Sequence, residues 1–439
     1  MKFIAFALSL IPLAFLLAFN TQLIGAEVNL PWFPAVGIQF HLAIDAISLV
    51  FLFLTAIIIP IVILVTSSTT LFYLLILLLE VLLFGFFTAR DLAVFTIFWE
   101  AMLLPLYFII SLWGGAFRYS AALKFLIYMI AGSSLMVAAV LALYFAGGNT
   151  FEMSALASSA ETLPYAKWIF FVFLLAFAVK TPLFPFHAWL PDAYVEAPIG
   201  GTILLSALLS KAGIYGIFRI GLGLFPHFLQ EWSPFLLTLA IIGVLYGGMA
   251  AWMQKDYKRL IAYSSFSHVN FVLAGLFVWS QTAHSGALLQ AFNHGITIAG
   301  LFLVAWWLEE RLGSRVIGKV SGLAQFMPIL CWLTLVFVLS SVALPGTNNF
   351  IGELMILLGV FGHNPWQAAV LGLTVILSVI YMLRWMQKVY FEKPNFFQER
   401  WVDIRGKELA LALPLILLIL WIGIYPAPLL KPIQEVFKP

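Results

Sequence analysis

The sequence predicts an all-α polytopic membrane protein with about 13 transmembrane helices. Of its 439 residues, 63% are hydrophobic and only 9% are charged, a balance that a water-soluble domain could not bury. Apolar runs of about 20 residues recur along the chain, and each is long enough to cross a bilayer. Two of these runs contain clustered prolines or a Pro-Gly pair. They are therefore expected to be broken helices whose backbone faces protein or water.

The first two predicted helices, 2–20 and 45–66, flank a loop on the membrane surface that contains Pro31, Pro34 and Gly37. The stretch 2–20 also has the charge pattern of a signal peptide, but its apolar run is long for one, so we interpret it as a membrane helix. The remaining predicted helices cover 69–88, 91–112, 120–146, 165–196 (broken), 199–222, 234–253, 258–279, 282–309, 326–362 (broken), 366–391 and 407–426.

The predicted helices divide into two similar sets of five. The first set covers 69–222 and the second 234–391, and the broken helix is the fourth in each. Because five is odd, the second set begins on the opposite side of the membrane, which is typical of inverted-repeat transporters with an ion site at the breaks. Two helices and the surface loop, 1–66, precede the repeats, and a last helix with its tail, 407–439, follows them.

The distribution of basic residues predicts the orientation. Loops after even-numbered helices carry most of the lysines and arginines, whereas loops after odd-numbered helices carry only Arg90, Lys167 and Arg219. The positive-inside rule therefore places the N-terminus in the cytoplasm and the C-terminus outside. The formal net charge of +3 is too small and too scattered for a nucleic-acid-binding protein.

Redox cofactors and metal ions are not expected in this chain. Its single cysteine, Cys331, cannot by itself hold an iron–sulfur cluster or a structural zinc. The sequence also lacks a Gly-rich nucleotide loop of the usual spacing. Any redox chemistry is therefore expected on partner proteins.

Seven ionisable residues fall near the middle of predicted helices or at a break. A charge at the bilayer centre costs at least ~2.5–3.5 kcal/mol, so such groups must pair or face water. Burial disfavours the charged forms of lysine and glutamate, and histidine exchanges protons near neutral pH, so the set is suited to a proton relay. The seven residues are Glu80, Glu100, Lys180, Lys211, His268, His294 and Glu353.

A Glu100–Lys180 ion pair is expected to hold the proton on Lys180, and opening the pair would release it. Other roles stay open for some residues: Glu80 could accept a bond between helices, and either central histidine could be a structural core residue. His187 is a further candidate for the relay, although it and its neighbours Asp192 and Glu196 could simply cap the second half of the first broken helix. Polar residues that could hold water between the charged groups are Ser206, Ser210, Tyr263, Ser264, Ser267, Asn293 and Thr297.

The motifs resemble the antiporter-like membrane subunits of respiratory complex I, the proton-translocating NADH–quinone oxidoreductase, and within them the bacterial chain M branch. The matching strings are HLAIDAISL (41–49), FWEAMLLPLYF (98–108), AFAVKTPLFPFHAWLPDAYVEAP (176–198), KDYKRLIAYSSFSHVNF (255–271) and ALPGTNNFIGELMIL (343–357). Together they are specific, span most of the chain and occur in the family's order. The family's usual 14 helices imply that this chain lacks the first one.

The resemblance implies a role for each charged position. Glu100 is similar to the glutamate before the lysine of the first broken helix, Lys180 to that lysine, and Lys211 to the central connecting lysine. His268 and His294 match the histidines of the central polar axis, and Glu80 resembles a further glutamate of chain M sequences. Glu353 matches the second broken helix, where chain M has glutamate and several sister subunits have lysine.

The resemblance also implies partners and cofactors. NADH, FMN, iron–sulfur clusters and quinone would bind to partner subunits, and neighbouring antiporter-like subunits and membrane lipid would surround this chain. A subunit of a multisubunit sodium/proton antiporter or of a membrane-bound hydrogenase is the alternative within the same fold. A passive scaffold is the alternative of a different class, and it predicts that neutralising the buried charges leaves transport intact.

Overall fold

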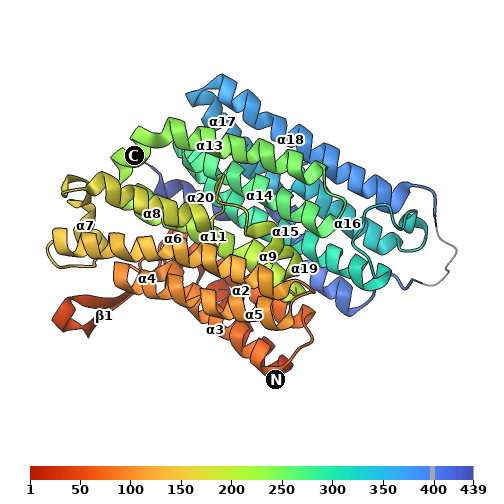
Figure 1. Ribbon diagram of the computed structural model, residues 1–439, viewed down its shortest axis with the longest axis horizontal. Helices are drawn as coiled ribbons and strands as arrows, with labels where there is room; N and C mark the ends of the chain where they lie inside the picture. The colour runs from red at the N-terminus through yellow and green to blue at the C-terminus, as the bar shows by residue number, and fades with distance from the viewer. Residues whose placement is uncertain (396–400, 439) are drawn as a thin grey trace. The chain divides into compact units, whose positions relative to one another are not determined.

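The computed structural model describes residues 1–395 and 401–438, which are helical apart from one β-hairpin and the connecting turns (Figure 1). The chain divides into two compact units, Met1–Leu237 and Thr238–Phe437. Within the described residues, ten helices are long and apolar enough to cross a membrane. This confirms an all-α polytopic membrane protein, whereas the count of 13 spans and the inverted repeats stay predictions.

The first unit follows the predicted helices closely, with shorter pieces where prolines, glycines or wide turns interrupt them. Its elements are α1 (Lys2–Phe19), η1 (Asn20–Leu23), β1 (Glu27–Phe33), η2 (Pro34–Val36), β2 (Ile38–Ala43), α2 (Ala46–Val65), α3 (Thr70–Thr88), α4 (Leu92–Ala101), α5 (Leu103–Trp113), α6 (Arg118–Ala146), α7 (Met153–Ala157), η3 (Ala160–Thr162), α8 (Ala166–Lys180), α9 (Leu190–Glu196), α10 (Ile199–Ile203), η4 (Leu204–Leu209), α11 (Ser210–Gly216), η5 (Ile217–Gly221) and α12 (Leu222–Leu224).

The prediction of a loop between the first two helices is wrong in part, because β1 and β2 form an antiparallel hairpin there. Val28 pairs with Leu42 and Leu30 with Phe40, residue types that favour extended backbone. The turn closes at Gly37, whose φ of 71° suits glycine. Figure 1 shows the hairpin projecting past the end of α4, on the side where α7 lies.

The predicted helix 91–112 is present as one candidate membrane span, Leu92–Trp113, although a turn at Met102 separates α4 from α5. Pro105 lacks the N–H that would bond to the carbonyl of Ala101, so the regular ladder cannot continue through this turn. The predicted helix 199–222 contains two wide π-type stretches, η4 and η5. The next helix, α13 (Pro226–Trp252), begins earlier than predicted, because Pro226 suits a first turn and Pro234 is accommodated inside the helix.

The second unit contains the second broken helix and the C-terminal elements, and α13 crosses into it from the first unit. Its elements are α14 (Tyr257–Leu276), α15 (Gln281–Leu312), η6 (Leu323–Gln325), α16 (Pro328–Ser341), α17 (Asn348–His363), α18 (Pro365–Met386), the π-type η7 (Gln387–Phe391), α19 (Lys407–Ile424) and α20 (Ala427–Val436). The helix α20 lies where only a tail was expected. Both predicted breaks are present, at 181–189 and 342–347.

Candidate functional site

Lys180 is the last residue of α8, where the first broken helix stops. Its side chain is only 1% exposed. Its Nζ donates to the carbonyl oxygen of Trp99 at 2.9 Å and lies 3.6 Å from the centroid of the Trp99 indole. Carbonyl oxygens and indole faces both stabilise cations away from water. The carbonyl and ring of Trp99 therefore form a cradle for this ammonium group, and no carboxylate of the described residues contacts it.

Glu100 is the residue next to that cradle, one position after Trp99 in α4. Its Oε2 accepts a hydrogen bond from the Ser133 hydroxyl on α6 at 3.1 Å. Among the described residues no ion pair joins Glu100 to Lys180, so the predicted direct pair is corrected. The reason is that the Nζ of Lys180 contacts the backbone carbonyl and the ring of Trp99 instead. Glu100 therefore acts on Lys180 by electrostatic attraction without direct contact.

His187 lies inside the first break, 9% exposed, and its ring stacks on Phe184 with the centroids 5.8 Å apart. The break itself is held by Trp189, whose indole N–H donates to the carbonyl of Val179 at 3.0 Å. The hydroxyl of Thr181 is buried and has no hydrogen-bond partner in the described part of the chain. A buried hydroxyl without a protein partner at a helix break is a natural place for a bound water molecule.

The acidic residues after the break tie the half-helix α9 to its surroundings. Asp192 pairs with Lys124 of α6 at 2.7 Å, and Glu196 Oε2 accepts from the backbone N–H of Phe117 at 2.9 Å. Both contacts join the half-helix to the first turns of α6. This favours the structural reading that the sequence left open for these two residues.

Lys211 is fully buried in α11, between the two π-type stretches. Its Nζ donates to the carbonyl of Ser206 at 2.6 Å and to the hydroxyl of Ser210 at 3.2 Å. A π-type turn widens the helix and leaves carbonyls for side-chain donors, and such turns are frequent at functional sites. Within the described residues no carboxylate pairs with this lysine. The hydrogen bonds of its Nζ therefore go to neutral oxygens.

Glu80 stands apart from the other predicted residues of its unit. It is 5% exposed on α3, and its Oε1 is buried with no hydrogen-bond partner among the described residues. It lines a cavity of about 630 Å³, whose other walls are mostly apolar side chains of α1, α3 and β2. No hydrogen bond or ion pair among the described residues joins it to Glu100, Lys180 or Lys211.

In the second unit the structure brings three predicted residues together. His268 Nδ1 lies 3.1 Å from Glu353 Oε1, and both residues are less than 5% exposed. The His268 and His294 rings stack with their centroids 5.7 Å apart, and His294 Nε2 lies 3.1 Å from the hydroxyl of Ser265. A carboxylate, two imidazoles and a hydroxyl therefore form one continuous set of groups that can exchange protons.

Gln290 is a member of this cluster that the sequence analysis missed. It lies on α15, and its side-chain N–H donates to Glu353 Oε1 at 3.0 Å. The signal was present, because Gln290 lies four residues before His294 and so shares its helix face. Several buried polar atoms nearby have no hydrogen-bond partner in the described residues. They are His268 Nε2, Gln290 Oε1, Asn293 Oδ1 and both side-chain polar atoms of Asn349.

The second break is anchored by an amide and hydroxyl network. Asn293 and Asn348 donate to each other's backbone carbonyls, at 2.7 and 3.1 Å. Asn348 Oδ1 accepts from Ser340 at 2.7 Å, and the Ser340 hydroxyl lies 2.7 Å from that of Thr297. The network fixes α15 against both halves of the broken helix, with Glu353 in the second turn of α17.

A second group missed from the sequence is an ion cluster at the start of α2. Asp45 pairs with Arg90 at 3.0 Å and with Arg219 of η5 at 2.8 Å. Burial would raise the pKa of Asp45, but the two guanidinium groups outweigh it, Arg219 more than Arg90, and lower the pKa to about 2. Tyr215 extends the cluster by accepting from Arg219 Nε and donating to the carbonyl of Phe87. The cluster fastens the helix of Lys211 to α2 and α3.

Comparison with known proteins gives a family match that covers most of the chain. Residues 89–380 match the family model described as NADH:quinone oxidoreductase/Mrp antiporter, TM. The NADH-quinone oxidoreductase subunit M of Rickettsia typhi is 37% identical over 408 residues, which cover 91% of this chain and 82% of the relative. Glu100, Lys180, Lys211, His268, His294 and Glu353 all lie inside the matched region.

Two solved structures share the fold. A chain of the respiratory complex I from Thermus thermophilus with bound NADH superposes with a TM-score of 0.90 and 35% identity, covering 100% of this chain and 99% of that one. A chain of the Mrp complex from Dietzia sp. superposes with a TM-score of 0.87 at 22% identity, over 99% of this chain and 91% of that one. At that lower identity the likeness concerns the fold alone.

Proposed function

The chain belongs to the NADH:quinone oxidoreductase/Mrp antiporter family of membrane proteins, in the subunit M branch, and on this basis we propose that its buried lysines, glutamates and histidines conduct the protons. It is a proton-translocating membrane subunit of a complex of the NADH–quinone oxidoreductase type. Its partners are the other membrane subunits of that complex. Quinone reduction elsewhere in the complex would drive the protons across the cytoplasmic membrane.

The observation that carries the proposal is that the two buried lysines and the glutamate of the second broken helix each lie beside an irregular stretch of helix. Lys180 ends α8 at the first break, Lys211 lies between two π-type stretches, and Glu353 follows the second break. Irregular backbone at membrane depth persists where protein or water satisfies it. Some buried polar atoms near His268, and the hydroxyl of Thr181, have no hydrogen-bond partner among the described residues. Water would occupy these positions and complete a proton path between the fixed groups.

Proton release from Lys180 would follow from the geometry of its cradle. The ammonium is buried and keeps its proton as long as the Trp99 carbonyl, the indole and the nearby carboxylate of Glu100 compensate for the lost water. A movement of α4 or α8 that weakens these contacts would favour the neutral amine. The proton would then pass by way of Lys211 and the histidines to Glu353 and the outside.

The redox cofactors are proposed to reside on partner subunits. The chain would bind no NADH, FMN, iron–sulfur cluster or quinone itself, and its task would be to move charge in response to a neighbour. Moving one charge against 100 mV costs ~2.3 kcal/mol, which a redox step can supply. The N-terminus is proposed to lie in the cytoplasm and the C-terminus outside.

The decisive experiment replaces Lys180 by arginine as well as by alanine in the assembled complex. Arginine keeps the positive charge but does not release its proton in proteins, so a relay predicts that both variants lose proton pumping to below about a tenth of wild type. Pumping is measured in vesicles with a pH-sensitive dye, with quinone reductase activity and a native gel to confirm assembly. Lys167→Ala, at an exposed lysine of the same helix, is the control.

A structural role for Lys180 gives a different pattern. If the positive charge only supports the fold, Lys180→Arg keeps wild-type pumping while Lys180→Ala fails to assemble. Undiminished pumping in an assembled Lys180→Ala complex would refute the relay altogether and support the passive scaffold.

A further inference from the structure

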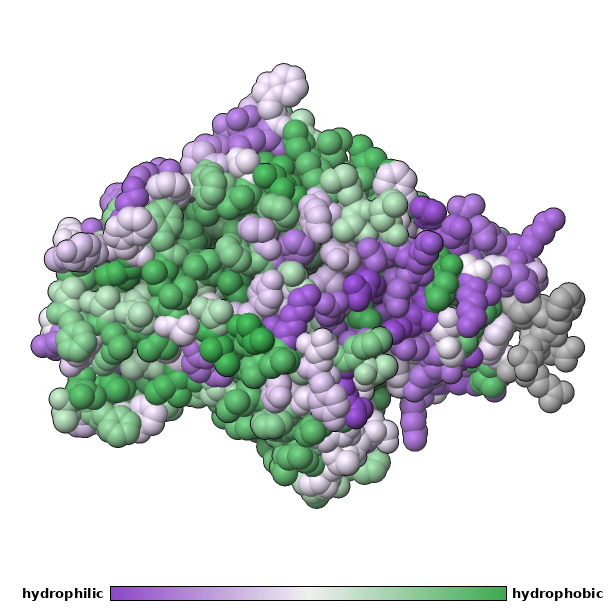
Figure 2. Space-filling model, in the orientation of Figure 1, coloured by the Kyte–Doolittle hydropathy of each residue, from purple (hydrophilic) through white to green (hydrophobic). Residues whose placement is uncertain are grey.

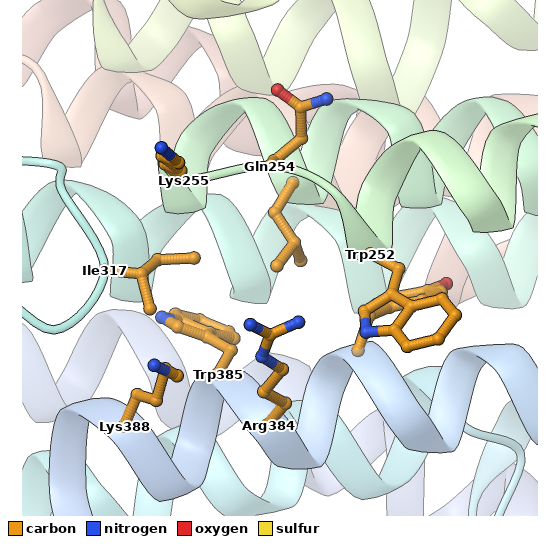
Figure 3. Close-up of a pocket in the computed structure, with 9 residues that line it drawn as sticks. Trp252, Gln254, Lys255, Ile317, Arg384, Trp385 and Lys388 are labelled. Carbon is orange, nitrogen blue, oxygen red and sulfur yellow. The ribbon is translucent and has the colours of Figure 1, made fainter.

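We propose that a basic pocket on the second unit binds the phosphate headgroup of an anionic phospholipid. The pocket is a cavity of about 220 Å³ between the segment that follows α13 and the end of α18. Figure 3 shows Arg384 and Lys388 projecting from α18 and η7 toward the segment that carries Gln254 and Lys255. None of the charged residues in the proton path proposed above is among those that line the pocket.

The side chains that line the pocket favour an anionic ligand. Of the described residues that line it, three are cations, Lys255, Arg384 and Lys388, and none is acidic. Within the described residues no hydrogen bond or ion pair reaches the charged end of any of the three. Like charges gathered around one cavity repel each other, and a bound phosphate would convert that repulsion into charge-assisted hydrogen bonds.

A buried donor in the pocket wall points to a ligand independently of the charges. Trp385 lines the cavity with its side chain only 1% exposed, and its indole N–H has no hydrogen-bond partner among the described residues. A buried donor without an acceptor costs free energy, so such groups are normally satisfied by protein, water or ligand. Figure 3 shows the indole nitrogen on the side of Lys388. A phosphate oxygen held by that lysine would supply the acceptor.

The surroundings favour a lipid headgroup over a free solute. Trp252 lines the pocket and is 41% exposed beside Met253, and Leu383 is exposed next to Arg384. Tryptophan and basic side chains of this kind gather where a membrane helix meets the headgroups, and basic pockets between membrane helices bind anionic lipids. Figure 2 shows hydrophilic residues gathered at the end of the visible face where α18 ends, against a hydrophobic surface. The volume is also below the ~300 Å³ typical of sites that enclose a whole small molecule.

The test compares retained lipid on the purified full chain. The delipidated chain is exchanged into bilayer discs of phosphatidylcholine with a minority of phosphatidylglycerol, and the phosphatidylglycerol that stays bound is counted by native mass spectrometry. We expect one bound phosphatidylglycerol, held roughly thirtyfold more weakly by the double variant Arg384→Gln/Lys388→Gln, since each basic side chain contributes similarly. The control Arg405→Gln/Lys407→Gln removes the same charge from exposed positions outside the pocket and should bind like wild type.

Two further arms make the outcome decisive. Lys255→Gln changes an exposed side chain, so it tests the pocket even if the double variant does not fold, and it should weaken retention severalfold. Inorganic phosphate alone is the probe for a free anion. Equal retention of phosphatidylcholine and phosphatidylglycerol would contradict the proposed lipid site. So would a control variant that loses as much bound phosphatidylglycerol as the double variant. Pocket-dependent phosphate binding that displaces the lipid at millimolar concentration would overturn the lipid assignment in favour of a soluble anion.

Discussion

At the scale of single residues, the buried ionisable groups are stabilised by neutral partners more often than by opposite charges. Lys180 bonds to a carbonyl and an indole, and Lys211 to a carbonyl and a hydroxyl. Glu353 accepts from an amide and contacts a histidine. In a buried ion pair, each charge would hold the proton on the base and keep it off the carboxylate. Neutral partners leave a smaller free-energy difference between the charged and uncharged forms of each buried group. A small difference is suited to proton transfer.

The contact between Gln290 and Glu353 gives a first prediction. Gln290→Leu removes a donor to a buried carboxylate, and hydrogen bonds to charged groups contribute ~1.5–3 kcal/mol. We expect the variant to assemble but to pump protons roughly tenfold more slowly. Dye-based pumping in vesicles, normalised to quinone reductase activity, is the measurement. Gln387→Leu, on an exposed side chain of η7, should pump normally, and normal pumping by Gln290→Leu would remove Gln290 from the site.

Asp45 gives a prediction about pH. Its folded pKa of about 2 lies below the ordinary 3.8, so its contribution to stability is full above pH 3.8 and is lost as the pH falls toward 2. Thermal unfolding of the purified chain should therefore show a loss of stability in this window that Asp45→Asn lacks. If wild type and Asp45→Asn fall in parallel, the ion cluster does not stabilise the fold.

At the scale of elements, the breaks and wide turns depend on close approach between helices. Gly213 on α11 faces the first break: an added Cβ would lie 2.8 Å from the carbonyl oxygen of Phe177 and 3.0 Å from the backbone nitrogen of Thr181. Both contacts are with backbone, which cannot rotate away. The helix of Lys211 therefore packs at this distance only because residue 213 lacks a side chain.

Gly213→Ala is accordingly expected to destabilise the chain by about 1–3 kcal/mol and to lower pumping, because it separates α11 from the end of α8. Thermal unfolding in detergent and pumping in vesicles would both report it. The matched control is Gly223→Ala, where an added Cβ meets nothing within 4 Å. Equal stability of the two variants would show that the contact between α8 and α11 has room to adjust.

At the scale of the whole molecule, the basic loops predict which side each loop faces. In a Cys331→Ala background, Ser158→Cys should react with a membrane-impermeant maleimide in intact spheroplasts, whereas Lys319→Cys should react only after permeabilisation. Both positions are exposed, so a missing reaction reflects the side of the membrane. The reverse labelling pattern would invert the proposed orientation and the direction of the proton path.

The sequence by itself determined the membrane character, the order of the helices, the two breaks and the positions of the buried charges. Hydropathy, proline and intramembrane charge act locally, so their effects can be read residue by residue. It missed the β1–β2 hairpin, the interruption at Met102 and the π-type stretches around Lys211. Each of these depends on hydrogen-bond ladders and neighbouring helices, which a hydropathy pattern does not record.

Only the tertiary structure decided the partners of the charged groups. The sequence paired Glu100 with Lys180 because opposite charges attract, whereas the structure gives Lys180 the carbonyl and ring of Trp99 and gives Glu353 the side chain of Gln290. A side chain bonds to whatever polar atom packing brings within about 3 Å. These contacts form between helices that are far apart in the chain, so residue spacing within one helix cannot predict them.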